Sequence, residues 1–438
     1  MFIQRFQSRV ALSPDRVAIS STDDDLTYRE LNAQAQSLAH TLSERGVRPG
    51  QLVILYGPRS PAIIVGMLGV MMAGCAYTVV EAEGIPAEQL RRIVEIAADF
   101  LIVSSDLVHL VEKAGLPWCT LSGHVRGPTL PAALAATTAY VLFTSGSTGV
   151  PKGVAVSHDN LAHYCTGLIA RLGLADGMTY AHVSTLAADL GNTSLFTSLW
   201  SGGTLYLAGE HERKDPMAML SALSRHRVNV LKITPTHWRS ILTVAQAAGE
   251  HAPKLDWLLL GGERLQTGLA RRTLQSGVAR RLVNHYGPTE TTIGVTVHPV
   301  ELDTLGDHED STVPIGRPFG RTTVKIRAAE GLFGSVDIEG ELYIGGPSVA
   351  QGYRNQEEAT RERFVDLRDG LGRYYRTGDW VRVNSEGTIT FIRRVDRQVK
   401  VNGYRVELEY IERAICGMAD ILRSSQIKPH LLSVGHAL

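Results

Sequence analysis

Short apolar segments alternate with helix-like segments through most of this chain, and this alternation limits the folds that it can adopt. The segments expected to form buried strands are QLVILY (51–56), DFLIVSS (99–105), GTLYLAG (203–209), VNVLKIT (228–234) and LDWLLLGG (255–262). Helical patterns such as AEQLRRIVEIAA (87–98) and PMAMLSALSRH (216–226) precede or separate them. This order predicts an α/β architecture in which helices cover mostly parallel sheets.

The pattern changes after about residue 320. Short strand-like segments separated by Gly-rich turns follow there: TTVKIRAA (322–329), GELYIGG (340–346) and GTITFIRR (387–394). They predict a β-rich subdomain joined to the α/β core.

The uncharged stretch from Ser60 to Val80 is nearly long enough to span a bilayer. We interpret it as a buried helix followed by a buried strand, because Pro61 can open a helix and Gly74 can close it.

Composition excludes several classes of partner. The 438 residues contain 44 Lys plus Arg and 44 Asp plus Glu. This balance does not favour nucleic acid or an anionic membrane as a partner. The four cysteines form no C-x-x-C pair, which indicates reduced thiols rather than disulfides or a zinc site. Arginines interrupt the N-terminal segment, so it does not resemble a signal peptide. We therefore expect a cytoplasmic enzyme whose partner is a small molecule or a protein.

The segment YVLFTSGSTGVPKGVAVSH (140–158) has the chemistry of a phosphate-binding loop. A short apolar strand precedes a loop whose glycines allow backbone N–H groups to turn toward one anion, and whose hydroxyls add donors. Lys152 supplies a positive charge for the same anion. The spacing departs from the G-x-x-x-x-G-K-[ST] pattern, because Pro151 occupies the position of the second glycine. The segment is therefore not an ordinary nucleotide triphosphatase loop.

Six other stretches, together with this loop, resemble the core motifs of the adenylate-forming superfamily in the same order. They are LTYREL (26–31), MMAGCAYTVVE (71–81), NHYGPTETT (284–292), GELYIGGPSVAQGY (340–353), YRTGDWV (375–381) and RRVDRQVKVNGYRVELEYIE (393–412). The chain is most similar to the adenylation domains of nonribosomal peptide synthetases. The resemblance implies an amino-acid adenylating ligase that forms an aminoacyl-adenylate from ATP, releases pyrophosphate and passes the aminoacyl group to the phosphopantetheine thiol of a carrier protein.

The resemblance also implies a nucleotide site with Mg²⁺. Glu290 resembles the family's Mg²⁺ ligand, Thr289 would contact the α-phosphate, and Asp379 would accept hydrogen bonds from the ribose. Thr144, Lys152, Thr289 and Glu290 are the expected catalytic residues. The expected nucleotide-binding residues are Thr144, Ser145, Gly146, Ser147, Thr148, Gly149, Lys152, Gly262, Glu263, Asn284, Tyr286, Gly287, Thr289, Asp379, Phe391 and Arg394.

An Asp in the family's "FDxS"-like segment pairs with the α-ammonium of an amino-acid substrate, and Asp189 takes that place here. The same alignment puts Leu190, Thr193, Lys232, Leu259, Gly261, His285, Ile293 and Gly294 around the substrate side chain, a set that resembles the aspartate-type pocket. A lysine in an otherwise apolar strand needs an anion, and the β-carboxylate of aspartate would supply it, with His285 as a second donor. A structural Asp or Glu could pair with Lys232 instead, and asparagine is the nearest rival substrate.

The resemblance divides the chain into an adenylation core at 1–394 and a partial small C-terminal α+β domain at 395–438, with Asp396 at the hinge and Lys400 beyond it. The family's small domain is longer and carries a late lysine, so the sequence predicts a truncated small domain and slow adenylation. Two functions stay open: an aspartate-activating enzyme, and a catalytically weak remnant that binds ATP and aspartate. A third, an acyl-CoA synthetase for another carboxylic acid, is disfavoured by Asp189 and Lys232 in the predicted pocket.

Overall fold

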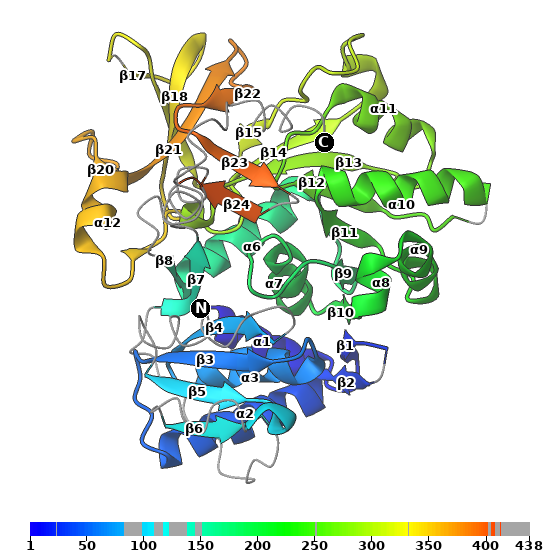
Figure 1. The fold of residues 1–438 in the computed structure, drawn as a ribbon, viewed down its shortest axis with the longest axis vertical. Coiled ribbons are helices and arrows are strands. Elements are labelled where there is room, and N and C mark those ends of the chain that lie inside the picture. The colour runs from blue at the N-terminus through cyan, green and yellow to red at the C-terminus, as the bar shows by residue number, and fades with distance from the viewer. Residues whose placement is uncertain are drawn as a thin grey trace, which may run out of the picture.

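The computed structural model describes residues 1–22, 24–82, 99–108, 117–121, 138–144, 151–249, 252–331, 333–401, 404–407 and 412. Within these ranges the chain forms two large sheets with helices between and around them, and a third sheet at one end (Figure 1). The helix predicted at 87–98 and most of the segment after the hinge lie outside the described residues.

The first large sheet has seven strands. In spatial order they are β19 (Gly352–Tyr353), β8 (Lys152–Ser157), β7 (Thr138–Thr144), β4 (Ala76–Glu81), β3 (Leu52–Gly57), β5 (Phe100–Val103) and β6 (Trp118–Thr120). The five strands from β7 to β6 run parallel, and β8 and β19 are antiparallel additions at one edge. The edge strand β19 comes from a part of the chain far from β8 in sequence.

The second large sheet has nine strands. In spatial order they are β15 (Arg317–Pro318), β14 (Thr296–Val300), β13 (Leu282–Tyr286), β12 (Trp257–Gly261), β11 (Val230–Ile233), β9 (Thr179–His182), β10 (Thr204–Leu207), β1 (Val17–Ser20) and β2 (Asp25–Thr27). Its six central strands, from β13 to β1, are parallel. The mostly parallel sheets predicted from the sequence are therefore confirmed, with antiparallel strands at their edges.

Helices fill the space between the two sheets. These are α1 (Phe2–Leu12), α2 (Tyr28–Glu44), α3 (Pro61–Met72), α6 (His158–Leu172) and α7 (Asn192–Ser201). Their buried side chains join residues of both sheets in one continuous hydrophobic cluster. The other face of the second sheet packs against α8 (Glu210–Lys214), α9 (Pro216–Arg225), α10 (Pro235–Ala248) and α11 (Thr267–Gln275). The core is thus shared by both sheets and holds them in a fixed relation.

Helix α3 begins and ends where the sequence predicts. Pro61 is in the first turn, where its missing N–H costs nothing, and Gly74 follows the helix with a φ of +75°. The ten residues from Ile63 to Met72 are all buried, because the helix lies between neighbouring elements on every side. Among the described residues no helix combines the length and the apolar character needed to cross a membrane.

The third sheet is antiparallel and forms the β-rich subdomain predicted after residue 320. It contains β17 (Phe333–Gly334), β16 (Thr323–Arg327), β18 (Ile338–Gly345), β21 (Arg373–Val383), β20 (Phe364–Asp366) and β22 (Ile389–Arg394). Helix α12 (Glu357–Arg363) precedes β20, and the short pair β23 (Gln398–Val401) and β24 (Tyr404–Glu407) follows β22. Val295 and Ile315, which flank strands of the second sheet, join the core of this subdomain.

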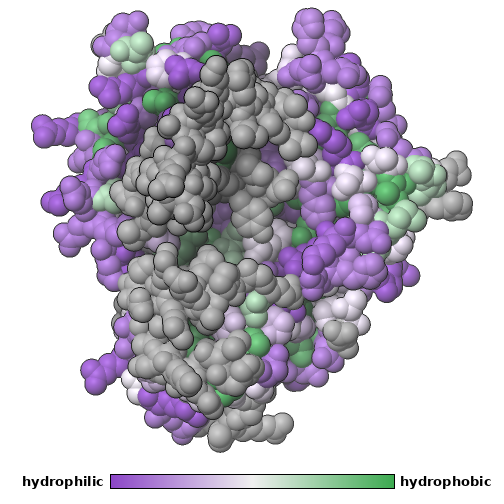
Figure 2. Space-filling view, in the orientation of Figure 1, coloured by the Kyte–Doolittle hydropathy of each residue, from purple (hydrophilic) through white to green (hydrophobic). Residues whose placement is uncertain are grey.

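Short 3₁₀ helices complete the fold: η1 (Ser105–Leu107), η3 (Thr289–Thr291) and η4 (Leu302–Thr304). On the face shown in Figure 2, hydrophilic residues cover most of the described surface and hydrophobic residues are scattered. Cys75, Cys119 and Cys165 are buried free thiols, as expected for packing residues, and Cys416 lies outside the described residues.

Candidate active site

Three neighbouring parallel strands of the second sheet bring together residues that were predicted to surround the substrate side chain. Lys232 of β11 pairs in register with Leu259 of β12, and Gly261 of β12 pairs with His285 of β13. Lys232 and His285 are each 2% exposed, and the Lys232 Nζ lies 2.8 Å from the His285 Nδ1. Carboxyl ends of parallel strands are where open α/β sheets bind ligands. These predicted residues therefore lie at the carboxyl edge of the parallel strands, where a ligand can bind.

The Lys232–His285 contact fixes the state of the imidazole. An ammonium only donates hydrogen bonds, so the ring accepts at Nδ1 and carries its own hydrogen on Nε2. Burial, and then the charge of Lys232, hold the pKa of His285 well below its ordinary value. The buried Nε2 atom makes no hydrogen bond to the described residues. The site thus presents an ammonium beside a neutral imidazole that has a donor to offer.

Two glycines make room for these side chains. A Cβ at Gly261 would lie 2.2 Å from the Lys232 Nζ, and a Cβ at Gly294 would lie 2.2 Å from the His285 ring. The residues before Gly294 are under backbone strain, since Thr292 and Ile293 have φ values of +62° and +67°. Such strain in residues other than glycine is concentrated at functional sites.

Sequence reasoning missed the aromatic residues around His285. Tyr164 of α6 and Phe319 lie with ring centroids 6.0 and 6.3 Å from the imidazole. The Tyr164 hydroxyl lies 2.8 Å from the Oγ1 of Thr193, a predicted site residue on α7. No local signal marks these aromatics, because they reach His285 only through the packing of distant elements.

Asp189 and Leu190 lie in the loop between β9 and α7, and both are half-buried. Burial is the main cause of the raised pKa values of Tyr140 and Tyr164, and the charge of Asp189 raises both further. The charge of Asp189 therefore acts on Tyr164, the tyrosine whose ring lies beside His285.

Glu81, at the end of β4, anchors the start of this loop. It accepts hydrogen bonds from the Leu186 backbone N–H at 2.6 Å and from the Thr185 hydroxyl at 3.0 Å. Arg59 contributes an ion pair to Glu81 at 3.5 Å. Glu81 ends the MMAGCAYTVVE motif, and the structure shows that it connects the first sheet to the loop.

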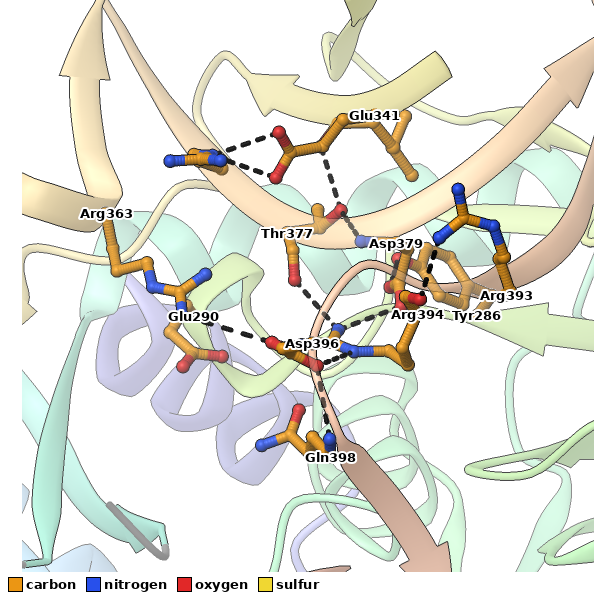
Figure 3. A network of polar contacts seen from close by, with 12 residues as sticks. Tyr286, Glu290, Glu341, Arg363, Thr377, Asp379, Arg393, Arg394, Asp396 and Gln398 are labelled. Carbon is orange, nitrogen blue, oxygen red and sulfur yellow. Dashed lines mark hydrogen bonds and ion pairs between the residues drawn. The ribbon is translucent and has the colours of Figure 1, made fainter. Parts of the chain in front are cut away.

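A second polar cluster lies where β13 meets the third sheet (Figure 3). The buried carboxylate of Asp379 on β21 accepts hydrogen bonds from the Tyr286 hydroxyl and, at 2.8 Å, from Arg394 Nη1. Burial and then the charge of Asp379 raise the pKa of Tyr286. Because strand side chains alternate, Tyr286 faces this cluster while its neighbour His285 faces Lys232. One strand therefore serves two adjacent groups of predicted residues.

Arg394 ties this cluster to the predicted hinge. Its Nε donates to Asp396 Oδ1 at 2.8 Å, and its Nη1 also donates to the Thr377 carbonyl at 2.8 Å (Figure 3). Burial alone would raise the pKa of Asp396, but the hydrogen bonds and charge of Arg394 bring it below the ordinary value. Gly378, with a φ of +75°, allows this approach, since a Cβ there would lie 2.9 Å from Arg394 Nη2.

The expected phosphate-binding residues are described only in part. Thr144 and Lys152 pair across the base of the loop that joins β7 and β8. Ser145, Gly146, Ser147, Thr148 and Gly149 lie outside the described residues. Thr289 and Glu290 lie on η3, where Glu290 is fully buried and accepts a hydrogen bond from the Tyr353 hydroxyl at 2.9 Å. Tyr353 was not among the predicted site residues, although it ends one of the quoted motifs.

The donor set suits a magnesium ion that is held chiefly by phosphates. Among the described residues no group of three or more His, Cys, Asp or Glu could hold a metal by itself. Mg²⁺ bound to a nucleotide commonly uses one or two carboxylates together with phosphate oxygens and water. A single buried carboxylate such as Glu290 is consistent with this kind of site.

The remaining predicted nucleotide residues lie nearby, and two of them bond to the protein backbone. The Asn284 amide donates to the Val313 and Pro314 carbonyls at 3.1 and 2.9 Å. Glu263 accepts a hydrogen bond from the Thr236 N–H at 3.0 Å, in the first turn of α10. Gly262 has a φ of +84°, a Cβ at Gly287 would lie 2.4 Å from Gly294, and Phe391 faces the Arg264 guanidinium at 4.7 Å.

Residues 6–354 match the AMP-binding enzyme family. The chain is 33% identical over 430 residues to surfactin synthase subunit 2 of Bacillus subtilis, with 96% of this chain covered and 12% of the synthase. It spans between 5% and 28% of the lengths of eight such synthases and synthetases.

Two solved structures share the fold. One is a four-domain nonribosomal peptide synthetase bound to AMP and glycine, with 27% identity, a TM-score of 0.79, and coverage of 96% of this chain and 31% of that one. The other is an artificially fused adenylation–PCP di-domain from Klebsiella oxytoca, with 24% identity, a TM-score of 0.84, and coverage of 95% and 83%. The chain therefore belongs to the AMP-binding enzyme family and is of the adenylation type found in nonribosomal peptide synthetases.

Proposed function

We propose that this chain activates L-aspartate as aspartyl-adenylate. A carboxylate oxygen of the amino acid attacks the α-phosphorus of ATP, and the bond to the β-phosphate oxygen breaks as pyrophosphate leaves. Membership of the AMP-binding enzyme family supports the reaction class. The observation that supports aspartate as the substrate is the buried Lys232 ammonium, which lies 2.8 Å from the neutral imidazole of His285.

The amino acid would be held at both ends. In this proposal Asp189 pairs with the α-ammonium, and Lys232 binds the β-carboxylate. His285 adds a second donor from Nε2, which is buried and makes no hydrogen bond to the described residues. Charge-assisted hydrogen bonds of this kind are stronger than neutral ones. Asparagine offers Lys232 only a neutral amide oxygen, and is therefore expected to be a poorer substrate.

ATP would lie along the second polar cluster. We assign Asp379 to the ribose hydroxyls, Tyr286 and Gly287 to the adenine, and Thr289 to the α-phosphate. The loop from Thr144 to Lys152 would hold the β- and γ-phosphates, where positive charge stabilises the leaving pyrophosphate. Mg²⁺, with Glu290 as a ligand, would neutralise phosphate charge.

The proposal also assigns two domains: an adenylation core at 1–394 and part of a small C-terminal domain at 395–438, with Asp396 at the hinge. The aminoacyl group would then pass to the phosphopantetheine thiol of a carrier protein. The fusion of an adenylation domain to a PCP domain in a protein of this fold is compatible with such a partner.

ATP–pyrophosphate exchange with a panel of acids tests the proposal. The panel contains aspartate, asparagine, glutamate, glycine, leucine, valine and 3-hydroxybenzoate. Aspartate should give the highest rate. Equal or faster exchange with asparagine would remove the aspartate assignment, and exchange with none of the acids would remove the proposed reaction.

A further inference from the structure

Tyr353 contacts both charged groups that the proposed reaction places at the phosphates. Its hydroxyl donates to Glu290 Oε1 at 2.9 Å. The Lys152 Nζ lies 5.3 Å from the centroid of its ring, within the range of a cation–π interaction. The side chain is buried, with 5% of the residue exposed. One tyrosine thus links the last residue of the predicted phosphate loop to the predicted magnesium ligand.

The backbone holds Tyr353 firmly between these partners. It pairs with Val154 in the first sheet, two residues after Lys152, and its N–H donates to the Thr360 hydroxyl at 2.9 Å. Phe364 packs against the ring at a right angle, with centroids 5.4 Å apart. The position of the phenol is therefore set by a sheet and by a second aromatic ring, independently of Lys152 and Glu290.

The segment around Tyr353 joins the same two regions a second time. The Ala350 N–H donates to the Glu290 carbonyl at 2.9 Å. The Gln356 side chain donates to the Pro151 carbonyl, directly before Lys152, at 2.9 Å. Residues 350–356 therefore connect η3 to the end of the phosphate loop through both backbone and side chains.

We propose that Tyr353 is a positioning residue for the nucleotide's phosphates and their Mg²⁺, an inference that rests on the proposed function. The hydroxyl fixes the rotation of the Glu290 carboxylate. The ring attracts the Lys152 ammonium without neutralising its charge, since it offers a quadrupole and not an anion. Tyr353 thereby sets the positions of a metal ligand and of a phosphate-binding cation while both keep their charges.

Two substitutions separate the roles of ring and hydroxyl. Tyr353→Phe keeps the ring and removes the donor to Glu290, so the Mg²⁺ concentration for half-maximal exchange should rise about tenfold. Its affinity for ATP in EDTA, measured by calorimetry, should change less than about twofold. Tyr353→Leu removes the ring as well, and should also weaken ATP binding in EDTA by about three- to tenfold.

Tyr374→Phe is the matched control. Tyr374 is also buried and also donates its hydroxyl to a carboxylate at 2.9 Å, but that carboxylate is Asp369, in the connection between β20 and β21. This variant should leave both the Mg²⁺ requirement and the ATP affinity unchanged. In a Glu290→Gln background, Tyr353→Phe should no longer alter the Mg²⁺ requirement, because its partner carboxylate is gone.

An unchanged Mg²⁺ requirement in folded Tyr353→Phe would overturn the inference, as would an equal effect in the Glu290→Gln background. If Tyr353→Phe does not fold, Thr360→Val serves instead. It removes the acceptor of the Tyr353 N–H, and should give a two- to threefold shift in the same direction. Wild-type protein that exchanges with no amino acid would refute the proposed function, and the calorimetric comparison of ATP with Mg²⁺ and with EDTA would still test Tyr353.

Discussion

Replacement of Lys232 by methionine is the sharpest test of the amino-acid site. Methionine is nearly as long as lysine and apolar, so the substitution removes the charge while keeping most of the buried volume. Lys232 is 2% exposed, and an aspartate carboxylate brought beside it would lose its hydration. Removing one partner of a buried charge pair costs about 3–5 kcal/mol. The ratio of aspartate to asparagine activation should therefore fall by about 10² to 10⁴.

The assay is pyrophosphate exchange with aspartate and asparagine, with ATP affinity measured by calorimetry on the same samples. ATP affinity should stay within about twofold of wild type, because Lys232 is assigned to the amino acid. The melting temperature should fall only modestly, because the substitution removes a buried charge but also leaves the His285 Nδ1 without its donor, which costs about 1–3 kcal/mol. Lys325→Met is the control: Lys325 lies on β16 of the third sheet and pairs at 3.4 Å with Asp369, in the connection between β20 and β21.

Three outcomes would refute the reasoning. An unchanged aspartate preference would show that the ammonium does not meet the β-carboxylate. Parallel loss of ATP binding and aspartate activation would place Lys232 in the nucleotide site. A strongly lowered melting temperature in Lys232→Met alone, with Lys325→Met unaffected, would assign the buried ammonium a structural role.

Three further predictions follow from described contacts. Asp379→Asn should weaken ATP binding about tenfold or more, because the ribose loses a charged acceptor; unchanged calorimetric affinity would remove the nucleotide assignment. Gly261→Ala should abolish aspartate exchange, because its Cβ would lie 2.2 Å from both the His285 carbonyl oxygen and the Lys232 Nζ. A Cβ at Gly306 meets nothing within 4 Å, so Gly306→Ala should leave exchange unchanged. Burial, and then the N-terminal ammonium, lower the pKa of His158 to about 4. Unfolded chains protonate this histidine near pH 6.5, so its share of stability is lost as the pH falls from 6.5 toward 4. His158→Gln should therefore remove about 2 kcal/mol of the acid destabilisation between pH 7 and pH 4.5, measured by urea unfolding at both pH values, and an identical pH dependence would contradict this.

The sequence was informative wherever the signal is local. Pro61 and Gly74 mark the ends of a helix within a few residues, and the apolar run containing Lys232 forms strand β11. The hydrophobic periodicity of strands and helices involves residues that are close in sequence, so it is visible in one amino-acid sequence. The change to a β-rich pattern near residue 320 was visible for the same reason.

Contacts between distant segments could not be found in this way. Tyr353 reaches Glu290 across 63 positions, and Tyr164 lies beside His285 only because α6 packs near the end of β13. The binding of Glu263 to the first turn of α10 likewise depends on how β12 and α10 pack. Hydrophobic periodicity does not predict such pairs, because the two residues come into contact only when the chain has folded.

The edge of the first sheet has a consequence for the synthesis of the chain. Strand β8 ends at Ser157, but β19, the strand that pairs with its outer side, begins at Gly352. At about 5–20 residues per second, the intervening stretch takes roughly 10 to 40 seconds to make. During that time the growing chain carries a strand whose partner does not yet exist, and unpaired edges of this kind can pair with another chain. Slowing translation between these two strands should therefore increase aggregation more than slowing it after residue 353.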